Sequence, residues 1–325
     1  MQLQMKKPKL SKKNLGKTRR STRRRARSVH KSVESNHQTN YNVGYNSGYN
    51  EGYNSGYDTA FDKGVFQGGD AIVDQLLPVN VILPSISVDS IIAAGLEHFH
   101  QQMVPVLPTV DIYELIRNAL EFRKPLSIIR LGDGELLTMA QGIQSSDQLH
   151  KDGTFLNYAG VDLPDYAAKD MLLQSVMQSS IVGIPRSRFR TFLPLAISIF
   201  ENYGIPYRSM ALTISTINYS LYVEGFLMDL LTGQRVLLVG NTTEGLKEKL
   251  MAKGIHIVDA IFPVQGIHDV HRVMNEIYAR DFDLALVSAG IPAVVIVQRI
   301  ATELGKVAID FGHLSDKISN GEAPL

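Results

Sequence analysis

Two carboxylates with a one-residue gap, Asp133 and Glu135, are the residues whose type and spacing best suit chemistry. Carboxylate oxygens bind hard divalent cations, and such cations commonly bridge to substrate phosphates. Gly132 and Gly134 flank Asp133 and permit backbone angles that residues with a Cβ avoid. Arg130 adds a positive charge just before the turn. Two interpretations are open: a site for a metal and a phosphorylated ligand, or a solvated turn with ordinary surface acids.

The elements around this turn place it at the end of a strand. Residues 127–131 form a short apolar, β-branched run of the kind that fills a buried strand. Leu136, Leu137 and Ala140 follow with helical spacing. Open α/β sheets bind ligands at the carboxyl ends of their strands. A turn at this point therefore presents its side chains where a ligand can bind.

A second strand end carries Gly240 and Asn241, followed by a helical pattern. Free N–H groups at a helix N-terminus attract anions. The Walker pattern is absent, because Leu246 stands where its lysine belongs and Lys247 replaces its Ser/Thr. A P-loop kinase or ATPase is therefore disfavoured. A nucleotide contact at Gly240–Thr242 and a plain strand–helix connection are equally compatible with the sequence.

Two later strand ends are also candidates. Ser288 and Gly290 are small and let a ligand approach the backbone, and Pro292 suits the first position of a helix. The last strand ends in Asp310-Phe-Gly-His313. An Asp and a His three residues apart across a glycine can converge on one metal or phosphate. A single histidine is also often only a satisfied surface or core group.

Several classes of protein are disfavoured. Gly132-x-Gly134 lacks the third glycine of a dinucleotide-binding fingerprint, because Leu137 occupies that place. A G-x-S-x-G nucleophile elbow does not occur. The absence of cysteine excludes disulfides and thiolate metal sites. We expect neither a membrane span nor a secretory signal, since long apolar runs without charges or breakers are lacking.

From about residue 109 onward, helical and strand patterns alternate. Strands are predicted over 127–131, 180–184, 235–240, 255–261, 284–288 and 306–311. Helices are predicted over 112–122, 165–179, 190–203, 217–231, 243–253, 267–280 and 292–304. Asp111 and Glu114 suggest a capping box for the first helix. The alternation predicts an α/β fold with a Rossmann-like, doubly wound, mostly parallel sheet over residues 110–325.

The N-terminal residues 1–40 form a basic tail that we expect to be disordered, because they contain too few large apolar groups to bury. Residues 1–31 hold 13 Lys/Arg and no acid, whereas the remaining 294 residues hold 20 bases and 32 acids. Such a tail either binds an anionic surface, nucleic acid or acidic polymer, or only keeps the chain soluble.

Residues 41–69 form a repeat with a period of four. Its aromatic positions are Tyr41, Tyr45, Tyr49, Tyr53, Tyr57 and Phe61. Each intervening glycine costs a helix about 1 kcal/mol relative to alanine. We therefore favour a flexible linker with aromatic interaction sites over a glycine-faced helix that forms on docking or in a homo-oligomer. Residues 70–109 are predicted to be a connector, with one amphipathic helix over 88–103.

Taken together, Arg130-Leu-Gly-Asp-Gly-Glu135 and the late Ser288-Ala-Gly-Ile-Pro and Ile309-Asp-Phe-Gly-His313 resemble the GT-D fold glycosyltransferases. These are bacterial enzymes that use sugar nucleotides and have one Rossmann-like domain. The resemblance covers about residues 110–325, and Ile291 departs from the Gly-Pro pair that is common in the family.

The resemblance implies roles for individual residues. Asp133 and Glu135 would be the metal ligands and, with His313, the catalytic residues. The cation would be manganese, with magnesium as the alternative, and the bound cofactor-like group would be the diphosphate of a UDP-sugar. The expected cofactor-binding positions are Arg130, Gly132, Gly134, Gly240, Asn241, Ser288, Gly290 and Asp310.

The expected activity is transfer of a hexose, in the first instance glucose, from a UDP-sugar to a hydroxyl of a glycan or glycoprotein acceptor. The metal would act as a Lewis acid on the departing UDP. The expected location is the bacterial cytoplasm, in association with a surface or coat layer. The alternative is a non-catalytic scaffold that binds a nucleotide while its N-terminal repeat makes the interactions.

Overall fold

The computed structural model describes residues 47–48, 51–188 and 192–325. The predicted basic tail, residues 1–40, lies outside them. The chain divides into two compact units, Met1–Met103 and Val104–Leu325. Within the described ranges, no helix combines the length and the apolar character that crossing a membrane requires.

The second unit has seven strands in its described residues, and every strand pairing is parallel. The strands are β1 (Leu126–Arg130), β2 (Ile181–Ile184), β3 (Leu212–Ile214), β4 (Arg235–Gly240), β5 (His256–Ile261), β6 (Leu284–Ser288) and β7 (Val307–Asp310). Their order across the sheet is β3-β2-β1-β7-β6-β4-β5. The predicted doubly wound α/β fold is thus confirmed.

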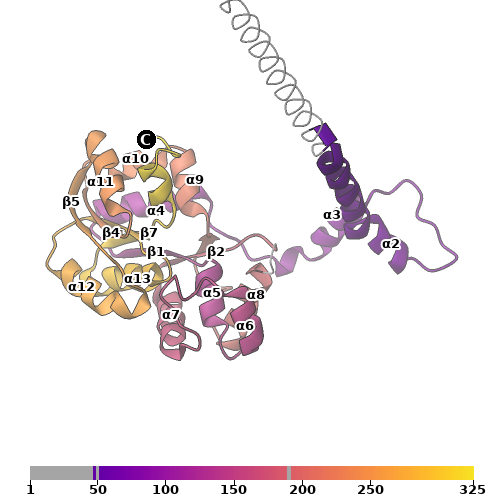
Figure 1. Cartoon of the computed structure of the whole chain (residues 1–325), viewed down its shortest axis with the longest axis horizontal. Coiled ribbons are helices and arrows are strands. Elements are labelled where there is room, and N and C mark those ends of the chain that lie inside the picture. The colour runs from indigo at the N-terminus through magenta and orange to yellow at the C-terminus, as the bar shows by residue number, and fades with distance from the viewer. Residues whose placement is uncertain (1–46, 49–50, 189–191) are drawn as a thin grey trace, which may run out of the picture. The chain divides into compact units, whose positions relative to one another are not determined.

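Helices cover both faces of this sheet (Figure 1). One face carries α5 (Asp133–Met139), α6 (Ser146–Asp152), α7 (Tyr166–Gln178), α8 (Phe192–Asn202), α12 (Val270–Tyr278) and α13 (Pro292–Leu304). The other carries α4 (Thr109–Glu121), α9 (Ile217–Val223), α10 (Phe226–Leu231), α11 (Thr243–Ala252) and α14 (Leu314–Ser319). Successive strand residues alternate between the faces. Ile129 accordingly belongs to the first core and Ile128 to the second.

Three local predictions need correction. The capping box was wrong: Pro108 precedes α4 without a side-chain cap, and Glu114 instead pairs with Arg117 at 2.6 Å. The helix predicted over 217–231 is two helices, because Gly225 interrupts it with φ +82°. The strand β3 was missed, since its three residues are too few to show a period.

The first unit is helical where the sequence favoured a linker. Residues 51–68 form a helix, so the preference for a flexible linker over this part of the repeat was wrong. The unit continues with α2 (Asp70–Leu76) and α3 (Val88–His98). The single helix predicted over 88–103 stops at His98 and is followed by the 3-10 turn η1 (His100–Gln102).

Gly240, at the end of β4, allows a close approach of two strands, which yields a stability prediction. Its φ is +136°, and a Cβ there would lie 2.1 Å from the carbonyl oxygen of Ser288 on β6. Gly240→Ala is expected to lower the free energy of unfolding by more than about 3 kcal/mol. The alanine would have to adopt a strained φ, and the backbone of Ser288 would also have to move away from its Cβ.

Gly254→Ala is the matched control for Gly240→Ala. Gly254 has φ +81°, but no described atom lies within 4 Å of its Cβ position. It should therefore cost only about 1–2 kcal/mol. Urea denaturation of both variants checks this; equal costs would contradict the role of the close approach.

Candidate functional site

The predicted strand-end turns meet at one edge of the sheet. The strands β1 and β6 lead into α5 and α13 on one face, whereas their neighbours β7 and β4 lead into α14 and α11 on the other. Adjacent strands whose following helices go to opposite faces leave a crevice at their carboxyl ends, which is where open α/β sheets bind ligands. We refer to this carboxyl edge of the sheet, formed by residues 131–133, 240–243, 288–292 and 311–313, as the crevice.

Arg130 ties the two central strands together at this edge. Its Nε donates to the carbonyl oxygen of Asp310 at 2.9 Å, and its Nη2 donates to Asp310 Oδ1 at 2.9 Å. Its Nη1 donates to Ser215 O at 3.1 Å and to Asn218 Oδ1 at 3.2 Å. Asn218 in turn donates to the carbonyl oxygen of Phe311 at 2.7 Å. The Arg130 guanidinium is thus occupied by the protein itself.

Gly312 has a steric role beside this guanidinium. Its φ is +52°, and a Cβ on it would lie 1.8 Å from Arg130 Nη2. Any side chain at residue 312 would displace the arginine from Asp310. The glycine of Asp310-x-Gly-His313 is therefore explained by the ion pair and requires no ligand.

The two carboxylates of the first turn have different environments. Glu135 Oε2 accepts a hydrogen bond from the Gly132 N–H at 2.8 Å and so caps α5. Its carboxylate lies inside the protein, and burial, with the negative charge of Asp310 added, raises the pKa of Glu135 to about 7. Asp133 is exposed, and its Oδ1 accepts from the Gly134 N–H at 3.0 Å.

This geometry bears on the predicted cation. Among the residues that the structure describes, no group of three or more His, Asp or Glu side chains is arranged to hold a metal. Asp133 fits as a single protein ligand beside substrate phosphates, because its Oδ2 makes no hydrogen bond to any described residue. Glu135 is less available to a cation, because its Oε2 already caps α5 through the Gly132 N–H and because its pKa is raised toward neutrality.

Asp310 and His313 end up in different surroundings. Asp310 is 4% exposed and pairs with Arg130; burial raises its pKa, and Arg130 opposes that shift. His313 is exposed at the N-terminus of α14. The Asp310 carboxylate is thus buried and paired with Arg130. The His313 imidazole, by contrast, is exposed to solvent beside the crevice.

The remaining predicted positions lie on the β4 and β6 side of the crevice. Asn241 bonds both ways to the backbone of Val264, donating to its carbonyl oxygen at 3.1 Å and accepting from its N–H at 2.8 Å. Gly290 has φ +60° with open space around it. The Oγ of Ser288 is buried and has no hydrogen-bond partner among the described residues. A buried hydroxyl without a partner is costly unless a ligand or water satisfies it.

Sequence reasoning missed Asn218, which supports Arg130 and Phe311. It considered Thr242 for a nucleotide contact but did not predict that Thr242 Oγ1 and Ser315 Oγ lie 2.9 Å apart and join the turn after β4 to α14. Asn218 lies in a helix that carries no motif, so no signal in the sequence indicated it.

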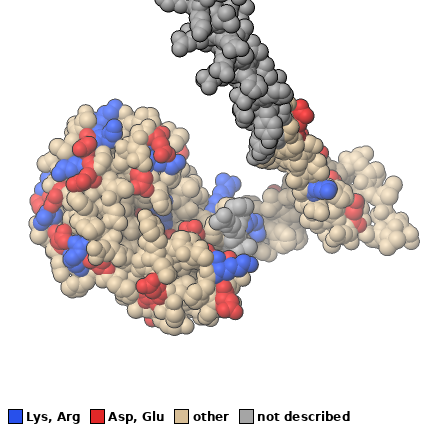
Figure 2. Space-filling model, in the orientation of Figure 1, with Lys and Arg blue, Asp and Glu red and all other residues tan. Residues whose placement is uncertain are grey.

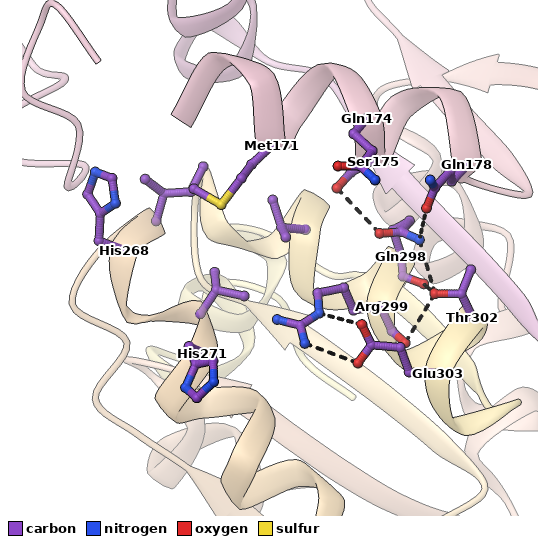
Figure 3. Close-up of a pocket in the computed structure, with 13 residues that line it drawn as sticks. Met171, Gln174, Ser175, Gln178, His268, His271, Gln298, Arg299, Thr302 and Glu303 are labelled. Carbon is purple, nitrogen blue, oxygen red and sulfur yellow. Dashed lines mark hydrogen bonds and ion pairs between the residues drawn. The ribbon is translucent and has the colours of Figure 1, made fainter. Parts of the chain in front are cut away.

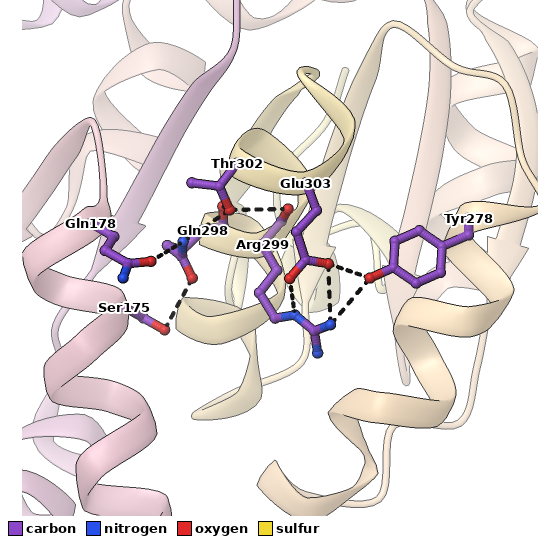
Figure 4. Close-up of polar contacts among 7 residues, drawn as sticks. All are labelled: Ser175, Gln178, Tyr278, Gln298, Arg299, Thr302 and Glu303. Atoms are coloured by element: carbon purple, nitrogen blue, oxygen red, sulfur yellow. Dashed lines mark hydrogen bonds and ion pairs between the residues drawn. The ribbon is translucent and has the colours of Figure 1, made fainter.

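A cavity of about 430 Å³ lies among the helices α7, α12 and α13 (Figure 3). Several of its polar groups bond to one another: Gln298 Nε2 donates to Gln178 and to Thr302, each at 3.0 Å. Arg299 contacts Glu303 at 2.7 Å and Tyr278 at 3.1 Å (Figure 4). Gln178 and Glu303 come from the helix ends that lead into β2 and β7, so this cavity is distinct from the crevice.

Comparison with known proteins places the second unit in a family. Residues 107–318 match the family described as GT-D-like, the GT-D fold-like domain. This match spans well over half of the chain, so the chain belongs to that family. Its second unit is accordingly a domain of the glycosyltransferase type. Among curated proteins none matches the sequence significantly.

Two solved structures are similar over about two thirds of the chain. One is a selenomethionine-substituted structure of domain of unknown function 1792, with 20% identity and a TM-score of 0.44. The other is described as showing that the highly conserved domain of unknown function 1792 has a distinct glycosyltransferase fold, with 19% identity and a TM-score of 0.46. Each alignment covers 67% of this chain and 82% of the other.

The Arg130–Asp310 ion pair gives a prediction for stability. Arg130→Met leaves the buried Asp310 carboxylate without its partner and should lower the free energy of unfolding by about 3–5 kcal/mol. Adding Asp310→Asn removes the uncompensated charge and should restore at least about 1 kcal/mol. Urea denaturation of the single and double variants measures this coupling.

The exposed pair of Arg117 and Glu114 is the control for Arg130. Arg117→Met should change stability by less than about 0.5 kcal/mol, because solvent screens such a pair. Strictly additive effects of Arg130→Met and Asp310→Asn would show that the two residues do not act as a pair.

The raised pKa of Glu135 predicts a pH dependence of stability. Between its ordinary pKa and about 7, the native protein binds more protons at Glu135 than the unfolded chain does. The stabilisation is therefore present at low pH and is lost as the pH rises through about 7. Relative to Glu135→Gln, which keeps the cap without the charge, the wild type should lose about 1–3 kcal/mol between about pH 5 and about pH 8.

Chemical denaturation at the two pH values tests the prediction for Glu135. Asp133→Asn is the control, because Asp133 is the exposed acid of the same turn. An identical pH profile for wild type and Glu135→Gln would mean that this carboxylate is already ionised in the native protein at low pH.

Proposed function

We propose that this protein transfers a hexose, with glucose the first candidate, from a UDP-sugar to a hydroxyl of a glycan or glycoprotein acceptor. The observation that carries the proposal is the convergence of four strand-end turns on one crevice in a domain of the GT-D family. The crevice combines an exposed carboxylate, an exposed imidazole and a buried hydroxyl with no hydrogen-bond partner in the described part of the chain.

The diphosphate of the donor would bind on the β4 and β6 side. The helices α11 and α13 begin there, and the free N–H groups of a helix N-terminus attract phosphate. The unpartnered Ser288 Oγ would donate to a phosphate or ribose oxygen. Gly290 leaves open space for the ligand beside the backbone.

The fixed positive charge for the diphosphate would not come from Arg130, which is occupied by Asp310. Arg186 and Arg188 are exposed just after β2, the neighbour of β1, at the same edge of the sheet. They would supply cationic groups to the diphosphate or to an acidic acceptor. Preorganised charges of this kind stabilise the negative charge that develops on the leaving group.

A divalent cation, manganese or magnesium, enters the proposal as a partner of Asp133. When bound together with the donor, it would neutralise charge on the departing UDP as a Lewis acid. His313, exposed at the start of α14, would hydrogen-bond the leaving group or the acceptor. We assign Glu135 a positioning role: its hydrogen bond to the Gly132 N–H holds the first turn of α5, and with it Asp133, in place.

The test is the release of UDP from a panel of UDP-sugars with manganese or magnesium present. We expect UDP-glucose to react and Asp133→Asn to lower kcat/KM at least about tenfold, which corresponds to one lost charged contact. Arg186→Ala combined with Arg188→Ala should raise KM more than it lowers kcat, because it removes binding groups. Glu248→Gln, an exposed acid on α11 away from the strand ends, should behave as wild type.

A non-catalytic scaffold is the alternative function. Calorimetry that detects UDP binding without release from any UDP-sugar, or equal release by wild type and Asp133→Asn, would favour it. The substituted side chains are exposed, so we expect each of these variants to keep the fold.

A further inference from the structure

The first unit presents apolar surface that it does not bury. None of its described residues between 51 and 103 is buried. Along the helix of residues 51–68, Tyr53, Tyr57 and Phe61 are each 60–62% exposed, and Val65 is 56% exposed. Figure 2 shows that the described part of this unit carries few charged side chains.

The aromatic side chains form an ordered row. Tyr53 and Tyr57 stack with ring centroids 6.5 Å apart, and Tyr57 and Phe61 stack at 6.4 Å. Residues four apart lie in one row along a helix surface. The three rings and Val65 therefore make a continuous apolar ridge.

A groove runs beside this ridge. The positions immediately before each ridge residue are Gly52, Gly56, Ala60 and Gly64, and they form the adjacent row of the same helix. At the three glycines, no described atom lies within 4 Å of the Cβ position. Small residues in such a row let the backbone of another helix approach closely.

Ridge and groove are complementary to each other, because both repeat every four residues. When two copies are related by a two-fold axis, the ridge of each faces the groove of the other. Rows of this spacing are inclined to the helix axis, so the two helices would cross rather than run parallel. A helix of unrelated sequence is not expected to share this four-residue period of ridge and groove.

The area is sufficient for a specific contact. Aromatic side chains bury about 150–250 Å² each, so a ridge that is roughly 60% exposed offers on the order of 400 Å² per chain. Two ridges give about 800 Å², and the two grooves they cover bring the total near the roughly 1,000 Å² of a small specific interface. A helix with this many glycines also needs such a contact, because glycine is the poorest helix former after proline.

We propose that the helix of residues 51–68 is a self-association element that joins two copies of this chain through its aromatic ridge and glycine groove. The proposal rests on the first unit alone and is independent of the transferase activity.

Sedimentation velocity of the full chain over a range of concentrations tests this. The wild type should shift from monomer to dimer with rising concentration. Tyr57→Ser, which interrupts the ridge, should weaken the association at least about tenfold. Gly56→Leu should do the same by filling the groove.

Two matched variants separate packing from helix formation. Gly56→Ala and Gly56→Leu both favour the helix, but only leucine fills the groove. Gly56→Ala should therefore still associate. Ser55→Leu adds the same side chain outside the groove row and should also associate. A wild type that stays monomeric, or Gly56→Leu associating as strongly as Gly56→Ala, would overturn the proposal.

Discussion

The ion pair between Arg130 and Asp310 is the interaction on which the crevice depends. Asp310 is buried, and a buried carboxylate is tolerated only when it is paired and hydrogen-bonded. The guanidinium bonds to the side chain and the backbone of Asp310 and to the start of α9. It therefore fixes the carboxyl ends of β1 and β7 relative to each other and excludes any side chain at residue 312.

This constraint separates the charged residues of the site into two groups. Arg130, Asp310 and Glu135 hold the backbone in place, and burial with the negative charge of Asp310 raises the pKa of Glu135 to about 7. Asp133 and His313 are exposed and free to meet a ligand. Neighbouring residues of one motif thus differ in role, because one side chain points into the protein and the next points out.

The first unit follows a different physical rule. The second unit buries its apolar residues on both faces of the sheet, so it is stabilised by its own core. The first has no buried residue between 51 and 103 among those described, and its helix carries glycines at a regular spacing. Self-association would supply the burial that this unit lacks.

The sequence by itself determined the alternation of strands and helices, the parallel sheet and the turns at its carboxyl edge, because apolar periodicity and glycine positions are local signals. It also gave the family, through Asp133, Glu135 and the Asp310-x-Gly-His313 ending. It could not show that Arg130 is taken up by Asp310, 180 residues away, or that Asn218 supports both. It also gave the wrong preference for residues 51–68, where intrinsic helix propensity predicted a linker. Only the tertiary structure decided the pairing of Arg130 with Asp310 and its support by Asn218, because ion pairing, burial and the direction of a side chain arise from contacts between segments that are distant in the chain.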